Sequence, residues 1–210
     1  MAKYQELADT VFRGDAAKCR ELSLKLVDGG AGPIEILNEG LYVGMAFVGD
    51  KFKSGEMFIP EVLRAANAMH ESMDVLRPLL TETEEISKGT VVFGTVQGDL
   101  HDIGKNLVCM MLEGGGFNVV DIGVDIPAEK FVEEVKKNKA KVLGISTLLT
   151  MTMPSIDDVV KAVRADNVAK DVKIMIGGAP VTRQYADLIG VDGYAPDATG
   201  AVDVTNELCK

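Results

Sequence analysis

Two stripes of apolar residues in the first eighty positions repeat at helical spacing, and each stripe follows a proline. Apolar side chains recur at steps of three or four after Pro33 and again after Pro60, a pattern that places them on one face of a helix. Proline is favoured at the first position of a helix. We therefore predict two helices that begin at these prolines. The stripe residues are Ile34, Leu37, Leu41, Met45 and Val48 in the first, and Val62, Ala66, Met69, Met73, Leu76 and Leu80 in the second.

Two further helices are predicted before Pro33. Tyr4, Leu7 and Val11 form a short apolar stripe, and Asp15 is a suitable N-cap for a helix that ends near Asp28. Four amphipathic helices with short connections are typical of an antiparallel bundle. We expect this helical domain to span residues 1–85.

From residue 89 the pattern changes to short apolar runs that alternate with helical stripes. The predicted strands are 90–95, 117–122, 141–146, 172–176 and 191–194, and the predicted helices are 103–113, 128–138, 155–165, 181–189 and 198–208. Alternating strands and helices indicate a parallel sheet covered on both faces. We predict an α/β chain in which a doubly wound, flavodoxin-like, five-stranded domain over 89–210 follows the helical domain, with the polar segment 81–88 as linker.

Composition narrows the class of protein. The 210 residues carry a net charge of −10, which argues against a nucleic-acid partner because phosphate binding needs a basic surface. No apolar run approaches the ~18 residues of a membrane span, and the N-terminus has no signal-peptide core. Cys19, Cys109 and Cys209 form no paired motif, which is typical of a reducing compartment. We expect a cytoplasmic protein without membrane or nucleic-acid contacts.

Three short motifs follow three of the predicted strands. Asp99, His101 and Gly104 come after the first strand, Ser146-Thr147-Leu148 follow after 41 intervening residues, and Gly177-Gly178 after a further 28. Open α/β sheets hold ligands outside the carboxyl ends of their strands. The three motifs are therefore expected to converge on one site at one edge of the sheet.

The chemistry of this site centres on one histidine. A dedicated zinc site needs three or four protein ligands, and the chain has only two histidines and no cysteine cluster. His101 can instead supply one axial ligand to a metal already held by a macrocycle. The carboxylate of Asp99 is placed to hold the other ring nitrogen, as carboxylates do for many metal-bound histidines. Glycine lets a backbone approach a large ligand closely.

The combined pattern DxHxxG–41–SxL–28–GG resembles the cobalamin-binding domain of B12-dependent methyltransferases. The helical half resembles the cap domain of methionine synthase. It is still more similar to the cap of the small two-domain corrinoid proteins of methanol and methylamine systems. The resemblance implies that His101 is the lower ligand to cobalt, that Asp99 holds its other nitrogen, and that the Thr152 hydroxyl completes this relay.

The same resemblance implies which residues contact the cofactor. In the cap it covers the stretch 50–62, whose Phe52, Ile59 and Val62 would shield the upper face of the corrin, although apolar residues of this kind more often form bundle core. In the α/β half, Ser146 and Leu148 would contact the displaced nucleotide tail. The full implied cofactor-binding set there is Gly98, Asp99, His101, Asp102, Ile103, Gly104, Ser146, Leu148, Thr150, Gly177 and Gly178.

The resemblance also implies a function, namely that of a corrinoid methyl carrier. Cob(I)alamin would accept a methyl group from a donor presented by a barrel-type methyltransferase. The resulting methylcobalamin would pass it, through a second methyltransferase, to an acceptor such as a tetrahydrofolate or coenzyme M. A reductive activase would restore the reduced cofactor. The chain would act as the corrinoid subunit of a multi-component methyltransferase with no turnover of its own.

Two alternatives share the motif. A cobalamin-dependent sensor or regulator would add an output region, and no basic segment precedes residue 20. The small subunit of an adenosylcobalamin mutase would lack the helical cap, against which the stretch 50–62 argues. The methyl donor stays open among methanol, methylamines, betaines and methoxylated aromatics, and so do the acceptor, the oligomeric state and the lower base of the corrinoid.

Overall fold

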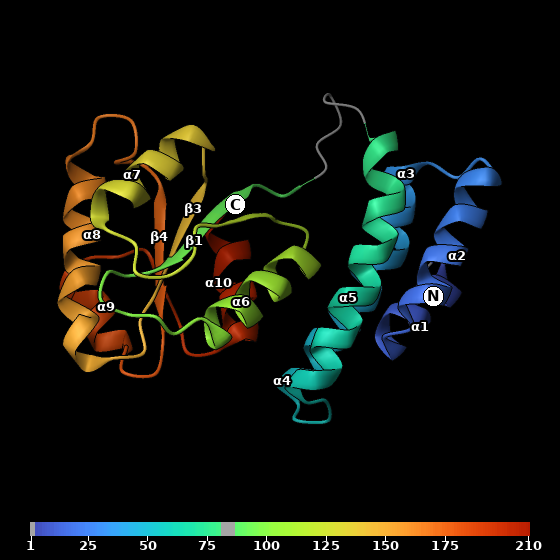
Figure 1. Cartoon of the computed structure of the whole chain (residues 1–210), viewed down its shortest axis with the longest axis horizontal. Helices are drawn as coiled ribbons and strands as arrows, with labels where there is room; N and C mark the ends of the chain where they lie inside the picture. The colour runs from blue at the N-terminus through green and yellow to red at the C-terminus, as the bar shows by residue number, and fades with distance from the viewer. Residues whose placement is uncertain (1–2, 81–86) are drawn as a thin grey trace. The chain divides into compact units, whose positions relative to one another are not determined.

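A computed structural model describes residues 3–80 and 87–210 of the chain (Figure 1). Within this part the chain divides into two compact units. Of the described residues, one unit comprises 3–80 with Gly114–Gly116, and the other comprises Ser87–Glu113 with Phe117–Lys210. Most of the predicted linker 81–88 lies outside the described residues, so the predicted boundaries at 85 and 89 stay a prediction.

The first unit is the predicted helical bundle. Asp15 caps its second helix by accepting a hydrogen bond from the backbone amide of Lys18 at 3.0 Å. Pro33 and Pro60 stand in the first turns of the helices predicted to begin at them. The helices are α1 (Gln5–Arg13), α2 (Ala16–Asp28), α3 (Pro33–Ile36), α4 (Tyr42–Lys53) and α5 (Ile59–Leu76), followed by the 3-10 turn η2 (Arg77–Leu79).

The helix that begins at Pro33 differs from the prediction of one regular α-helix. A π-helical segment, η1 (Leu37–Leu41), joins α3 to α4. At Gly40 an added Cβ would lie 2.8 Å from the Leu7 side chain, so α1 packs directly against the wider turn. Leu37 and Leu41 are both buried, as the stripe predicted. Apolar spacing alone did not reveal the change in hydrogen bonding, because Leu37 and Leu41 are four residues apart, as on one face of an α-helix.

The second unit is the predicted five-stranded parallel sheet. Its strands are β1 (Thr90–Thr95), β2 (Asn118–Asp121), β3 (Val142–Ser146), β4 (Lys173–Gly177) and β5 (Gly193–Ala195). They lie in the order β2-β1-β3-β4-β5, with every pair parallel. This is the flavodoxin-like order. The predicted strands and helices of this unit lie within two residues of those observed.

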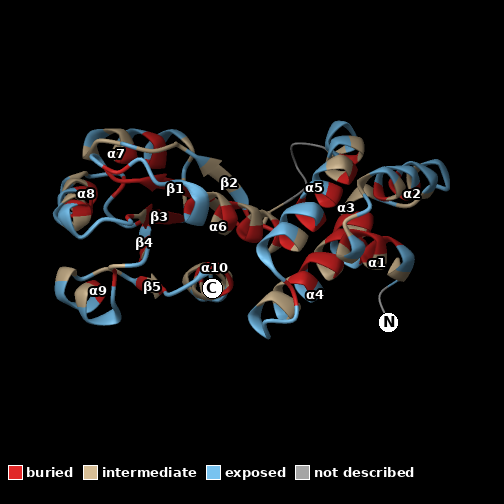
Figure 2. Cartoon of the chain, turned by 60° about the horizontal axis from the view of Figure 1, so that its bottom comes forward, coloured by how far each residue is buried: buried red, intermediate tan, exposed pale blue. Residues whose placement is uncertain are grey.

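Helices cover both faces of this sheet, and the central strands are buried between them (Figure 2). One core cluster joins the sheet to α7 (Ala128–Lys137), α8 (Met153–Ala165) and α9 (Arg183–Ile189). The second cluster joins it to α6 (Ile103–Gly114) and α10 (Ala198–Leu208). Among the described residues, no helix has the length and apolar character that crossing a bilayer would require.

The sheet topology brings the three sequence motifs together. The strand order reverses between β1 and β3, which is where doubly wound folds bind ligands. Thr95 at the end of β1 pairs with Ser146 at the end of β3, and Ser146 pairs in turn with Gly177 at the end of β4. The prediction that the three loops converge on one edge of the sheet is therefore confirmed.

Candidate functional site

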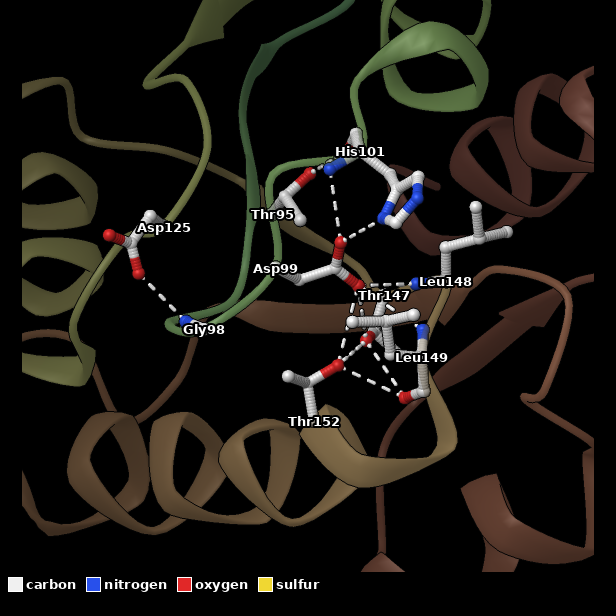
Figure 3. A network of polar contacts seen from close by, with 9 residues as sticks. All are labelled: Thr95, Gly98, Asp99, His101, Asp125, Thr147, Leu148, Leu149 and Thr152. Atoms are coloured by element: carbon white, nitrogen blue, oxygen red, sulfur yellow. Dashed lines mark hydrogen bonds and ion pairs between the residues drawn. The ribbon is translucent and has the colours of Figure 1, made fainter.

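The carboxylate of Asp99 lies at the centre of this edge with no exposed surface (Figure 3). Its Oδ1 atom accepts two hydrogen bonds from His101. One comes from the backbone amide at 3.0 Å, and the other joins the ring Nδ1 at 2.7 Å. This double contact fixes both the loop and the ring, and it leaves Nε2 as the ring nitrogen that points away from the carboxylate (Figure 3).

The other oxygen of Asp99 holds the loop that follows β3. Oδ2 accepts hydrogen bonds from the backbone amides of Leu148 and Leu149, at 2.6 and 3.3 Å. It also accepts from the hydroxyls of Thr147 and Thr152, at 2.9 and 3.3 Å. The two hydroxyls lie 2.6 Å apart. One buried carboxylate thus joins the loops after β1 and β3 and the start of α8.

The hydrogen bonds around Asp99 determine its ionisation. Burial raises the pKa of this carboxyl, but the amides of His101 and Leu148, the His101 ring and the Thr147 hydroxyl together hold the pKa well below its usual range. Asp99 is therefore an anion, and an anionic acceptor at Nδ1 places the ring proton there. In the neutral imidazole, Nε2 then carries the lone pair that a metal ligand needs.

The remaining predicted residues of this half line the same edge and are mostly open to solvent. The His101 side chain is 51% exposed. Among the apolar neighbours, Leu100 and Ile103 are exposed beside it, and Leu148 and Met151 are exposed after β3. Gly98, Asp102, Gly104, Thr150 and Gly178 are exposed, Ser146 and Gly177 are partly buried, and Thr152 is buried.

The fold itself gives a reason for glycine at position 178. Its φ is +121°, and an added Cβ would lie 1.7 Å from the carbonyl oxygen of Thr147. A side chain at Gly177 would lie 3.0 Å from the carbonyl oxygen of Ala195. The backbone conformation and the Thr147 contact therefore require glycine at position 178. This requirement is independent of any space that Gly177 and Gly178 provide for a ligand.

Gly178→Ala is expected to destabilise the protein by at least about 2 kcal/mol, because backbone strain and steric overlap add. Urea unfolding of the cofactor-free protein measures this loss. Gly190→Ala is the matched control, because Gly190 also has a positive φ, +70°, but nothing within 4 Å of an added Cβ. Equal losses in the two variants would show that the Thr147 contact has no energetic role.

The three predicted cap residues lie near the connection between α4 and α5. Phe52 is partly buried near the end of α4, and Ile59 is 42% exposed at the start of α5. Val62 is fully buried and therefore occupies a core position. Phe58, just before α5, is 68% exposed. Its backbone amide donates a hydrogen bond to the Glu61 carboxylate at 2.8 Å. Whether these residues shield a corrin stays a prediction.

Thr147 and Asp125 are among the residues of the site that had no predicted role. Thr147 is fully buried and donates to Asp99, although it stood in a recognised motif as the unspecified position. Asp125, in the connection after β2, accepts a hydrogen bond from the backbone amide of Gly98. No spacing rule points to Asp125, because the contact joins two loops from different strands.

The ligating side chains of the site fit a metal whose equatorial ligands come from a cofactor and not from the protein. Among the described residues, no group of three or more His, Cys, Asp or Glu side chains could hold a metal ion. The site offers a single imidazole, held by a buried carboxylate and surrounded by exposed apolar side chains. A large apolar macrocycle with one free axial position suits these features.

Comparisons with known proteins agree with this assignment. Two family models, each described as a B12 binding domain, match residues 89–203 and 4–77. Dimethylamine corrinoid protein 1 of Methanosarcina acetivorans is 42% identical over 207 residues, which cover 97% of this chain and 96% of the relative. Trimethylamine corrinoid protein 1 of the same organism is 39% identical over 196 residues, which cover 92% of this chain and 91% of the relative.

A solved structure is also similar to this chain over both units. The methanol:cobalamin methyltransferase complex of Methanosarcina barkeri contains a chain with a TM-score of 0.89 and 30% identity, matched over 97% of this chain and 78% of that one. The fold, the site and these matches define a cobalamin-binding protein built from two B12-binding domains. The chain belongs to the corrinoid proteins of methyltransferase systems, in which it is the methyl-carrier component.

Proposed function

We propose that His101 binds the cobalt of cobalamin through Nε2 from the lower face. The observation that carries this proposal is the buried Asp99 carboxylate, which holds Nδ1 of the half-exposed His101 ring at 2.7 Å and leaves Nε2 directed away from that carboxylate. When bound, cobalamin supplies the nucleophile that accepts a methyl group and later releases it. The protein contributes ligation, orientation and shielding.

Asp99 and Thr152 act as a relay behind this histidine in our proposal, with Thr147 as a third member. Thr147 and Thr152 share Oδ2 of Asp99 and also contact each other, so both hydroxyls act on the carboxylate that holds the imidazole. The exposed glycines and apolar residues of the edge, with Ser146, would contact the corrin ring and the nucleotide tail. Phe52 and Ile59 would shield the upper face from the cap.

We propose a methylamine as the methyl donor, with dimethylamine first. Relatives named for dimethylamine and trimethylamine match more than nine-tenths of the chain at about 40% identity. Methanol is the second candidate, because a chain of the methanol:cobalamin methyltransferase complex shares the fold of both units. A mutase subunit is less well supported, since the cap residues 4–77 also match a B12 binding domain. A cobalamin sensor is less well supported, since the relatives that match more than nine-tenths of the chain are named corrinoid proteins of methylamines.

Partners supply the remaining steps of the proposed cycle. A barrel-type methyltransferase presents the donor, a second methyltransferase delivers the methyl group to a folate or to coenzyme M, and a reductive activase maintains the reduced cofactor. Neither described unit is a barrel, a fold that takes ~250 residues. The three free cysteines are compatible with a cytoplasmic location.

The test of this proposal is turnover with defined partners. We expect the cofactor-loaded protein to show no steady methyl transfer alone. With a dimethylamine-specific barrel methyltransferase and a reductant, the cofactor spectrum should change to the methylated form. The same assay with a methanol-specific barrel protein is the comparison. Steady transfer by this chain alone would contradict the carrier role, and a response only to the methanol-specific partner would contradict the donor assignment.

A further inference from the structure

The loop that carries His101 is held at both ends by one neighbouring segment, residues 121–125, which begins at the last residue of β2 and is called the brace below. At the first end, Oδ1 of Asp125 accepts a hydrogen bond from the backbone amide of Gly98 at 2.7 Å (Figure 3). The backbone amide of Asp125 donates in return to the carbonyl oxygen of Asp99 at 3.0 Å. The brace is thus hydrogen-bonded to Gly98 and Asp99, shortly before the histidine.

The backbone of Asp125 adopts a conformation that needs such support. Its φ is 56°, in the left-handed region that few residues other than glycine occupy, although aspartate tolerates it better than most. Gly98, its partner, also has a positive φ, of +86°. Strained backbone of this kind persists where surrounding contacts fix it, and it gathers at functional sites.

At the other end of the loop, the brace holds the first turn of α6. Lys105 is buried, with 2% of its side chain exposed, and its ammonium group forms an ion pair with Asp121. The same ammonium group donates to Oδ1 of Asn106 at 2.6 Å. Asp121 is itself fixed, because its second oxygen accepts from the backbone amide of Gly123 at 2.9 Å. A buried cation requires a partner of this kind.

We propose that Asp125 and the Lys105–Asp121 pair are positioning residues for His101. Fixing the loop on both sides of the histidine limits the movements that would carry the imidazole away from the direction set by Asp99. None of the three residues needs to contact the cofactor for this effect. The inference rests on the proposed ligation by His101 and names the residues outside the relay on which that ligation depends.

The experiment measures how much bound cofactor carries a protein nitrogen. The protein, labelled with histidine that carries the heavy nitrogen isotope, is loaded with cob(II)alamin. The part of the EPR nitrogen splitting that the label alters reports the fraction of cobalt bound by the imidazole. Asp125→Ala should lower the ratio of histidine-bound to histidine-free cofactor by roughly tenfold, as loss of an outer partner of a metal ligand does. Asp125→Asn keeps an acceptor oxygen for Gly98 and should restore most of the signal.

A second variant tests the other end of the loop. Lys105→Met combined with Asp121→Asn removes both charges, so that no buried ion is left without a partner. We expect it to lower the same ratio, and its circular dichroism spectrum reports whether the fold is retained. If this double variant fails to fold, the comparison of Asp125→Ala with Asp125→Asn still tests the proposal.

Asp166→Ala is the matched control. Asp166 also accepts backbone hydrogen bonds in a loop, from Val168 at 2.8 Å and Ala169 at 2.9 Å, but it follows the far end of α8. Its loss should weaken the fold without altering the EPR spectrum. An unchanged spectrum in Asp125→Ala, or an equal change in Asp166→Ala, would overturn the inference. Absence of nitrogen splitting in the unmodified protein would instead contradict the proposed ligation itself.

Discussion

His101→Ala is expected to abolish the protein-derived nitrogen splitting in the EPR spectrum of the cob(II)alamin-loaded protein. The variant removes the one imidazole that the site presents, and no group of three or more other ligating side chains exists in the described residues to replace it. The fold should survive, because the side chain is half exposed and its loss removes one hydrogen bond, worth about 1 kcal/mol.

The chain offers a matched control for this variant, since it contains only one other histidine. His70→Ala, in the helical unit, should leave the splitting unchanged. Labelling the protein with histidine that carries the heavy nitrogen isotope should alter the splitting in the unmodified chain. Splitting in the unmodified chain that ignores the label would assign the nitrogen to the lower base of the cofactor and contradict the proposal.

Asp99→Asn should damage both stability and ligation, although it preserves the shape of the side chain. Both carboxylate oxygens accept hydrogen bonds from backbone amides. Either orientation of the asparagine amide therefore turns an NH2 group against a partly buried backbone N–H donor. Because an unsatisfied buried group costs about 1–3 kcal/mol, we expect an unfolding free energy lower by at least that amount. Nitrogen splitting from His101 should also weaken.

Urea unfolding followed by circular dichroism measures the stability part of this prediction. Asp158→Asn serves as the control, because Asp158 is exposed on α8 and the same chemical change should shift stability by less than about 0.5 kcal/mol there. If Asp99→Asn unfolds at the same urea concentration as the control, the network around the carboxylate contributes little. If its stability falls but the nitrogen splitting does not, Asp99 acts on the fold and not on the histidine.

Much of the fold could be predicted because it depends on local pattern. The change from helical spacing to alternating strands and helices after residue 89 predicted both architectures. The N-cap at Asp15 and the helix start at Pro33 are properties of a few adjacent residues. The π-helical segment at Leu37–Leu41 escaped prediction because the apolar spacing of this stretch is also that of an α-helix.

The candidate site also combines contacts within one loop, which the sequence could predict, with contacts between distant loops, which it could not. Asp99 and His101 are two residues apart, so their side chains can meet within one loop, and the spacing was sufficient to predict the pair. Thr147 reaches the same carboxylate from 48 residues away, and Asp125 holds Gly98 across 27. Such contacts exist only after the sheet has brought its strand ends together.

From the sequence alone one could predict the two architectures, the edge of the sheet at which the three motifs meet, and His101 as the candidate metal ligand there. These follow from periodicity, from the rule that parallel strands present their carboxyl ends together, and from the small number of ligating side chains. The tertiary structure decided which groups surround Asp99, why Gly178 must be glycine, and how the histidine loop is braced. Each of these depends on distances between atoms of different strands and loops, and no local pattern encodes such distances.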